Sequence, residues 1–348
     1  MLAAAVLFDA EPLYVPGVAL LALGVLALGW VMLGSAGAGV VREITAKRVV
    51  EDEQVDIRVS VRAGALALPG TCLDDPLLSE PLPLRAGRRS VRVRIEARFA
   101  RRGWRELAPP GLRVRDPLGL AEANVAGSGE PDVLLVLPRV EPVLSTSSAG
   151  ASAAAGGRRS NTLAAETEID GVRPHRPGAP ASRIYWPSVA RGGALLERRL
   201  HAESDSRPMI VLDASHSPDE HDLDAAVRAV ASLAVHLART GGCAVLLPGD
   251  RRPTTLDPSM RGWSQLHSRL AVLEGGQRAT GGALSTRRGA VIWVSGSRTS
   301  RPPRPLQLAG ASARVLVVPG ELPARRASFK VAGCTGYMLS AREMGEAA

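Results

Sequence analysis

Cysteine is rare in this chain. Only Cys72, Cys243 and Cys334 occur among its 348 residues, and they lie far apart. No two of them have the Cys-x-x-Cys spacing of a zinc knuckle or a dithiol redox site, so the sequence excludes both. A sparse, odd-numbered set of thiols is compatible with a reducing compartment.

Aromatic side chains are also scarce, at 3% of the chain. The cores must therefore be built from Val, Leu, Ile and Ala. The length is sufficient for two soluble domains and a membrane anchor.

The sequence lacks the motifs of the common catalytic classes. It has no Gly-x-x-x-x-Gly-Lys-Ser/Thr loop, no dinucleotide-binding glycine fingerprint and no Gly-x-Ser-x-Gly elbow. Although His216 and His221 are close in sequence, no third ligand stands at zinc-binding spacing. The sequence therefore lacks the motifs needed for ATP hydrolysis, serine hydrolysis and zinc catalysis. The six histidines are His175, His201, His216, His221, His236 and His267.

The net charge of +9 permits three interpretations: a nucleic-acid partner, an anionic membrane surface, or a generally basic composition. Basic residues alternate with acidic ones, as in Arg98–Glu106 and Glu197–Asp205, and no long Lys/Arg block occurs. Zinc-finger, leucine-zipper and ribonucleoprotein motifs are also absent. We favour the third interpretation and expect no nucleic-acid partner.

One long apolar run is present near the N-terminus. Val15–Leu33 contains 19 uncharged residues, and as a helix it spans about 28 Å, close to the ~30 Å of a bilayer's hydrocarbon core. Pro16 lies near its start and Trp30 near its end, where an indole favours the membrane interface. We predict a membrane anchor over residues 1–40, with its helix at about 15–33.

A cleaved signal peptide is the alternative, because Ser35–Ala38 resembles a small-residue cleavage site. A retained helix is favoured, since Asp9 and Glu11 precede the run and no Lys or Arg does. The apolar residues 1–8 are too short to span alone, so a shortened first helix or an upstream start are both compatible with the pattern.

Flanking charges predict the orientation of the helix. Acids precede it, whereas Arg42, Lys47 and Arg48 follow it. The positive-inside rule then places the C-terminal body in the cytoplasm. Cleavage of the segment would instead place the body outside the cell.

Residues 43–142 have the pattern of a β-domain. Val55–Arg62 and Ser90–Phe99 alternate apolar and polar residues, as half-buried antiparallel strands do. Short strands separated by Pro, Gly and Asp clusters predict an immunoglobulin-like sandwich, which would act as a spacer. The Ser-, Ala- and Gly-rich residues 143–162 predict a flexible linker.

Residues 205–335 alternate strand and helix patterns, followed by a tail over 336–348. Pro208–Asp213 is a continuous apolar run, and Leu223–Leu237 has apolar residues at helical spacing. Further strands are expected at Cys243–Leu247, Ala290–Val294 and Ala313–Val318. This alternation predicts a mostly parallel, doubly wound sheet. The whole chain is therefore expected to be an α+β multidomain protein.

The carboxyl end of the first strand of this sheet is the candidate chemical site, because open α/β sheets bind ligands there. Asp213, Ser215 and Ser217 supply one carboxylate and two hydroxyls, which are ligands suited to Mg²⁺. The later strand at Trp293 continues into Ser-Gly-Ser without an acid. Ser217–Glu220 also reads as a helix N-cap with a capping box. Metal binding and a purely structural loop are both open, and we favour the structural loop.

The segment over residues 163–204 carries a recognisable pattern of an acid, Arg, Gly, Arg, Ile-x-Trp and Ala-Arg. This pattern resembles the signature of the domain-of-unknown-function 58 (DUF58) family, although Ala179 stands where many members have Asp. Arg101–Glu106 and Arg115–Leu120 match further landmarks of that family, so the resemblance extends from about Glu43 onward. The matching residues are Glu168, Arg173, Gly178, Arg183, Ile184, Trp186, Ala190 and Arg191.

The half that follows the linker resembles a von Willebrand factor A-type domain. In that comparison Asp213, Ser215 and Ser217 correspond to the metal-ion-dependent adhesion site, whose additional Thr and distal Asp have no clear match here. A degenerate site is the result, with Mg²⁺ as the only cofactor to consider.

The resemblance implies partners rather than a reaction. DUF58 proteins are commonly paired with a MoxR-type AAA+ ATPase, and sometimes with a transglutaminase-like membrane protein. Arg173, Arg183, Trp186 and Arg191 are then either packing and ion-pairing residues, with Trp186 against the sheet, or a docking surface. We expect a membrane-anchored, non-enzymatic interaction protein. The alternative is a metal-dependent hydrolase at the Asp213 loop, with His216 as its only candidate base.

Overall fold

The computed structural model describes residues 11–67, 70–146, 169–174, 184–200, 207–215, 217, 219–277, 284, 289–323 and 325–340. The chain divides into two compact units, Met1–Leu137 and Pro138–Ala348. Each unit has its own apolar cores.

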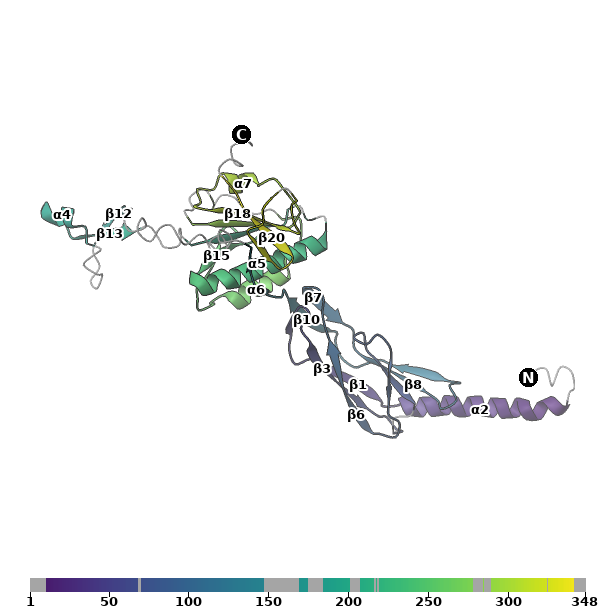
Figure 1. The fold of residues 1–348 in the computed structure, drawn as a ribbon. Coiled ribbons are helices and arrows are strands. Elements are labelled where there is room, and N and C mark those ends of the chain that lie inside the picture. Colours follow the sequence, from purple (N-terminus) through teal and green to yellow (C-terminus); the bar gives the residue numbers. More distant parts are fainter. Residues whose placement is uncertain are drawn as a thin grey trace. The chain divides into compact units, whose positions relative to one another are not determined.

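Unit 1 begins with a long apolar helix. Helix α2 (Glu11–Ser35) is 25 residues long, so it rises about 37 Å. It extends beyond the predicted 15–33 at both ends, and it is the one helix of the described residues that is long and apolar enough to cross a membrane. Its last turns lie against strands β8 (Gly111–Arg115) and β9 (Glu122–Val125) (Figure 1).

The rest of unit 1 is β-structure in three sheets. Their orders are β1-β3-β6, β2-β10-β7 and β5-β4-β8-β9, and every pair is antiparallel except β2 with β10. In β3 the residues Ile57, Val59 and Val61 are buried while the intervening ones are more exposed, as the alternating sequence predicts. The remaining bounds are β1 (Gly39–Glu43), β2 (Arg48–Val50), β3 (Val55–Arg62), β4 (Thr71–Asp74), β5 (Leu82–Leu84), β6 (Ser90–Ala97), β7 (Gly103–Leu107) and β10 (Asp132–Leu137).

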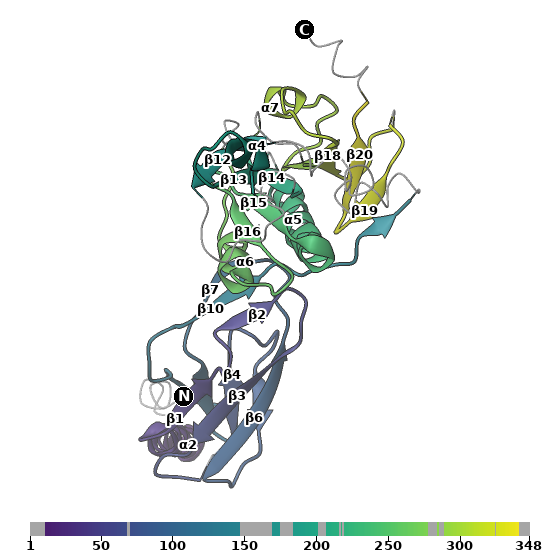
Figure 2. The same cartoon turned by 90° about the vertical axis from the view of Figure 1, so that its left-hand side faces the viewer.

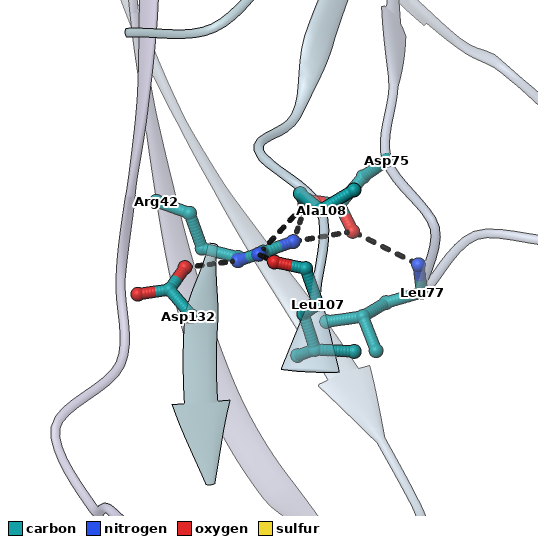
Figure 3. Close-up of polar contacts among 6 residues, drawn as sticks. All are labelled: Arg42, Asp75, Leu77, Leu107, Ala108 and Asp132. Carbon is teal, nitrogen blue, oxygen red and sulfur yellow. Dashed lines mark hydrogen bonds and ion pairs between the residues drawn. The ribbon is translucent and has the colours of Figure 1, made fainter. Parts of the chain in front are cut away.

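A buried arginine joins the strands of unit 1 (Figure 3). The Arg42 guanidinium donates to the carboxylates of Asp75, at 3.2 and 3.3 Å, and Asp132, at 2.8 Å. It also donates to the carbonyl oxygens of Leu107 and Ala108, at 2.8 and 2.9 Å. Arg42 follows the helix in sequence, as Lys47 and Arg48 do, but its side chain is 0% exposed.

Unit 2 is built on a sheet in the order β11-β19-β20-β18-β17-β14-β15-β16. Strands β15, β14, β17 and β18 are parallel neighbours. The outer strands β16, β20, β19 and β11 pair antiparallel, so the sheet is mixed rather than mostly parallel. The bounds are β11 (Leu144–Ser145), β14 (Met209–Asp213), β15 (Cys243–Leu246), β16 (Thr254–Leu256), β17 (Val291–Ser295), β18 (Arg314–Pro319), β19 (Phe329–Val331) and β20 (Cys334–Met338).

Helices cover both faces of this sheet. Helices α5 (Glu220–Gly241) and α6 (Trp263–Ala271) pack on one face with Ile210, Leu212 and their neighbours. Helix α7 (Arg304–Gln307) packs on the other face through Leu306, against Met209 and Trp293 among others. Figure 2 shows α5 lying across β14 and β15, and Figure 1 shows α7 on the far side. The sheet strands are apolar on both faces for this reason.

Two predicted boundaries differ from the structure. Strand β11 lies within the predicted linker 143–162 and pairs with β19. The chain ahead of it is held to unit 2, since His267 Nε2 lies 2.7 Å from the Pro138 carbonyl and Glu141 N–H donates to Ser232 Oγ at 2.9 Å. Strand β20 continues to Met338, so the sheet extends into the predicted tail 336–348.

Candidate functional site

The carboxyl ends of β14 and β17 meet at one edge of the unit 2 sheet. Asp213 is the last residue of β14, and it pairs in register with Ser295, the last residue of β17. Gly296 N–H then donates to the Asp213 carbonyl at 2.8 Å. Parallel pairing therefore places the predicted loop beside the Ser-Gly-Ser that follows β17.

The polar groups of the Asp213 loop bind the protein's own backbone. The Asp213 carboxylate accepts a hydrogen bond from Ser215 N–H at 3.1 Å, which closes a turn directly after the strand. Ser217 Oγ donates to the Gly296 carbonyl at 3.0 Å. A Cβ placed on Gly296 would lie 2.2 Å from that Oγ, so this contact requires glycine at 296. Sequence reasoning missed Gly296, although a glycine between two serines after a strand was a visible signal.

The prediction that Ser217 caps the following helix is wrong. The N-cap of α5 is Asp219, whose carboxylate accepts from His221 N–H at 2.9 Å. A carboxylate is a strong N-cap and favours the positive end of the helix dipole. The Ser217 hydroxyl instead hydrogen-bonds its loop to the backbone of Gly296, directly after β17.

Other charges at this edge are in ion pairs. Arg298 lies 3.5 Å from the Asp222 carboxylate, and Arg269 lies 2.6 Å from that of Asp250. Ser297 N–H donates to Ser295 Oγ at 3.2 Å, where a von Willebrand-type site would have its distal acid. In the described part of the chain, no group of three or more His, Cys, Asp or Glu side chains is placed to hold a metal ion. The site fits a structural loop, whose polar side chains bond the protein's own backbone, better than a Mg²⁺ site. Mg²⁺ binding at Asp213, Ser215 and Ser217 stays a prediction.

The two cysteines of unit 2 are not reactive candidates. Burial raises the pKa of the Cys243 thiol to about 12, and burial likewise raises the pKa of the Cys334 thiol to about 12. Because the thiolate is the nucleophile, both side chains are inert at neutral pH.

The family signature forms a hairpin with a short helix. Strands β12 (Ile169–Pro174) and β13 (Leu196–Leu200) are antiparallel, and Arg173 lies opposite Glu197 in the backbone register. Helix α4 (Trp186–Ala190) stands between them in sequence. Four positions of the signature lie outside the described residues: Glu168, Gly178, Ala179 and Arg183.

The turn around α4 presents an exposed tryptophan. Ser188 Oγ donates to the Ala194 carbonyl at 2.9 Å, and Tyr185 N–H donates to the Leu196 carbonyl at 2.8 Å. These bonds fix the backbone on either side of the helix. Trp186 is nevertheless 56% exposed, so the predicted packing of its ring against the sheet is not found. Arg191, at the end of the same helix, is also exposed.

Comparison with known proteins does not assign a family. No family model matches the chain, and no curated sequence does. The CARDB domain of the PF1109 protein from Pyrococcus furiosus, solved in complex with di-metal ions, is similar over 29% of this chain and 87% of that one, with 12% identity and a TM-score of 0.21. Cwp6 from Clostridium difficile is similar over 73% of this chain and 33% of its own, with 11% identity and a TM-score of 0.19. Neither similarity is close enough to support a conclusion about function.

Proposed function

We propose that this chain is a membrane-anchored, non-enzymatic protein-interaction module of the DUF58 type. In this proposal α2 anchors it, unit 1 is an immunoglobulin-like spacer, and unit 2 is a von Willebrand A-like domain in the cytoplasm. Its partner is a MoxR-type AAA+ ATPase, with a transglutaminase-like membrane protein as a possible third component. The process served is assembly or maturation at the cell envelope.

The order of the parallel strands supports the von Willebrand-like assignment. The first parallel strand, β14, is central, with β15 on one side and β17 and then β18 on the other. Helices on both faces complete the arrangement of a doubly wound core. The antiparallel strands are additions at the two edges of that core.

The exposure of Trp186 is the observation that carries the interaction role. A tryptophan is among the most buried side chains on average, and it is enriched at the energetic centres of protein interfaces. Here it stands on a turn whose backbone is fixed by Ser188 and Tyr185, and the exposed Arg191 follows directly after the same short helix. By contrast, the described polar groups at the sheet edge are bonded to loop backbone or to each other.

The test is a binding measurement with a MoxR-type ATPase from the same genome. The full chain in nanodiscs is titrated with the ATPase in the ATP-bound, ADP-bound and nucleotide-free states. Trp186→Ala is expected to weaken binding by about 30-fold or more, the effect of removing a tryptophan hot spot. Trp104→Ala is the matched control, because Trp104 is 62% exposed in unit 1 and should leave the affinity unchanged. Absence of binding by the wild type in all three states contradicts the proposal.

The cytoplasmic placement has a separate test. Single cysteines replace Glu11, the first residue of α2, and Gln54, which lies after the helix and directly before β3; both residues are exposed. A membrane-impermeant maleimide is expected to label the Glu11→Cys variant in intact cells and the Gln54→Cys variant only after permeabilisation. The reverse pattern, or loss of residue 11 from the mature chain, would instead support an extracellular body.

A further inference from the structure

One end of unit 1 lies next to the C-terminus of α2. The helix ends at Ser35, and β1 starts at Gly39, which pairs with Arg62 at the end of β3. Arg62 in turn pairs with Ser90 at the start of β6. Backbone hydrogen bonds join the intervening loops, since Ala65 N–H donates to the Ala36 carbonyl and Ala63 N–H to the Arg89 carbonyl, both at 2.9 Å.

The turn between β8 and β9 lies at this same end. Thr71 of β4 pairs with Leu84 of β5 on one side and with Val114 of β8 on the other. Arg115 N–H then donates to the Gly70 carbonyl at 2.8 Å. The loops at residues 63–65, 85–89 and 116–121 therefore surround the end of α2, and we call them the helix-proximal end. Figure 1 shows β8 beside the helix.

The β8–β9 turn presents two leucines to the outside. Leu118 is 65% exposed and Leu120 is 61% exposed. The turn is well ordered, because the buried Asp116 carboxylate accepts from Leu118 N–H at 2.9 Å and from Ala121 N–H at 2.6 Å. Behind it, Arg115 and Glu122 form a 2.6 Å ion pair across the hairpin.

The helix-proximal end is also strongly basic. Within the described residues no ion pair involves the guanidinium of Arg62, Arg85, Arg88 or Arg89, and all four are exposed. The acidic residues near it do not neutralise these four arginines, since Asp116 is buried among backbone amides and Glu122 pairs with Arg115. An unpaired cluster of arginines is attracted to anionic lipid headgroups, with which guanidinium forms bidentate hydrogen bonds.

Packing against the helix sets the depth of the hairpin. Gly17, Ala27, Val31 and Gly34 are the buried residues of the helix, three of them in its second half, and strands β9 and β8 pack on α2. Ala27 is six residues before Leu33, the end of the apolar run, so it lies about 9 Å inside the hydrocarbon when that run spans the bilayer. A hairpin that reaches this level of the helix must enter the interface.

We infer that the helix-proximal end is a second membrane-binding surface, in which Leu118 and Leu120 insert into the boundary between headgroups and acyl chains while Arg62, Arg85, Arg88 and Arg89 bind anionic headgroups. Apolar side chains of interfacial segments are buried about 5–10 Å deep in this way. The occupant is the same leaflet that α2 enters. This inference rests on the proposed anchoring by α2.

The test uses an environment-sensitive fluorophore on single cysteines of the full chain, reconstituted in vesicles of phosphatidylcholine with phosphatidylglycerol. Cys72→Ser supplies the background, since the two buried thiols of unit 2 do not react. Probes are placed at Leu118→Cys and Leu120→Cys, with Gln54→Cys as control at the opposite end of β3. Spin-labelled phosphatidylcholine should quench the two turn probes and shift their emission to the blue, and it should leave the control unchanged.

A probe at Val25→Cys, exposed on α2, distinguishes anchoring by α2 from membrane binding by the helix-proximal end. Quenching at Val25 without quenching at Leu118 and Leu120 overturns the second membrane surface and leaves the anchor standing. No quenching at Val25 overturns the anchor itself. Replacing the four arginines by Gln should reduce quenching at Leu120 in the anionic vesicles to the level found in pure phosphatidylcholine; an unchanged value overturns the headgroup contact.

Discussion

Replacing Arg42 by Met should destabilise unit 1 more than any surface substitution. The guanidinium and the Asp75 carboxylate are both 0% exposed, so the variant leaves a buried carboxylate without its cation. Breaking a buried pair in this way costs about 3–5 kcal/mol. The Leu107 and Ala108 carbonyls also lose their donors. The total is comparable to the ~5–15 kcal/mol stability of a whole domain.

Native-state hydrogen exchange of β3 measures this loss in unit 1 alone. The amides of Ile57, Val59 and Val61 lie in the core of the unit. Their protection should fall by roughly two to four orders of magnitude, since each 1.4 kcal/mol is tenfold. Arg94→Met is the matched control, because Arg94 pairs with Asp56 at the surface, and it should leave protection close to the wild-type value.

A double variant tests the cause. Asp75→Asn removes the buried charge but keeps an oxygen for Leu77 N–H, which donates to Asp75 Oδ1 at 2.9 Å. Arg42→Met with Asp75→Asn should therefore be more stable than Arg42→Met alone, with a coupling of about 1–3 kcal/mol. Protection of β3 within tenfold of wild type in Arg42→Met, or a double variant weaker than the single, would refute the reasoning.

Three further predictions concern unit 2. Gly296→Ala should lower the melting temperature more than Ser217→Ala, because the new Cβ would meet Ser217 Oγ at 2.2 Å, whereas losing one hydrogen bond costs about 1 kcal/mol; calorimetry of both variants decides this, and equal shifts would contradict it. Mg²⁺ should not raise the melting temperature of the wild type, and a rise that disappears in Asp213→Ala would establish a metal site instead. Burial lowers the pKa of His267, despite its hydrogen bond to the Pro138 carbonyl. The folded state therefore binds a proton less readily than the unfolded state. The contribution of His267 to stability is complete above about pH 6.5 and is lost as the pH falls through the folded-state pKa. His267→Gln should remove that pH dependence in exchange measurements on α6, and an unchanged pH profile would show that another group is responsible.

Local patterns predicted the elements that depend on local periodicity. The alternation in Val55–Arg62 corresponds to the burial pattern of β3, because a strand turns successive side chains to opposite faces. The apolar spacing in Leu223–Leu237 likewise matches the buried face of α5. The extent of α2 also followed from its unbroken apolar run, to within a turn at each end.

Short antiparallel strands and helix caps were harder to predict. Strands β16 and β19 are three residues each, too short for periodicity to be visible, and their place in the sheet depends on long-range pairing. The Ser217 loop matched a capping box, yet Asp219 caps the helix. A capping motif identifies residues that are able to cap a helix. Here the Ser217 hydroxyl donates to the neighbouring Gly296 carbonyl instead, and only the tertiary structure brings that carbonyl close to it.

The sequence by itself determined that the chain has an apolar segment able to span a bilayer, a β-rich region after it, and an α/β region with a polar strand end at Asp213. These features depend on composition and on spacing along the chain. Only the tertiary structure decided which charges lie near the helix. Arg42 follows α2 closely in sequence but is buried, whereas Arg62, Arg85, Arg88 and Arg89 reach the end of the helix through antiparallel pairing. Strand register brings distant residues together, and no local pattern encodes it.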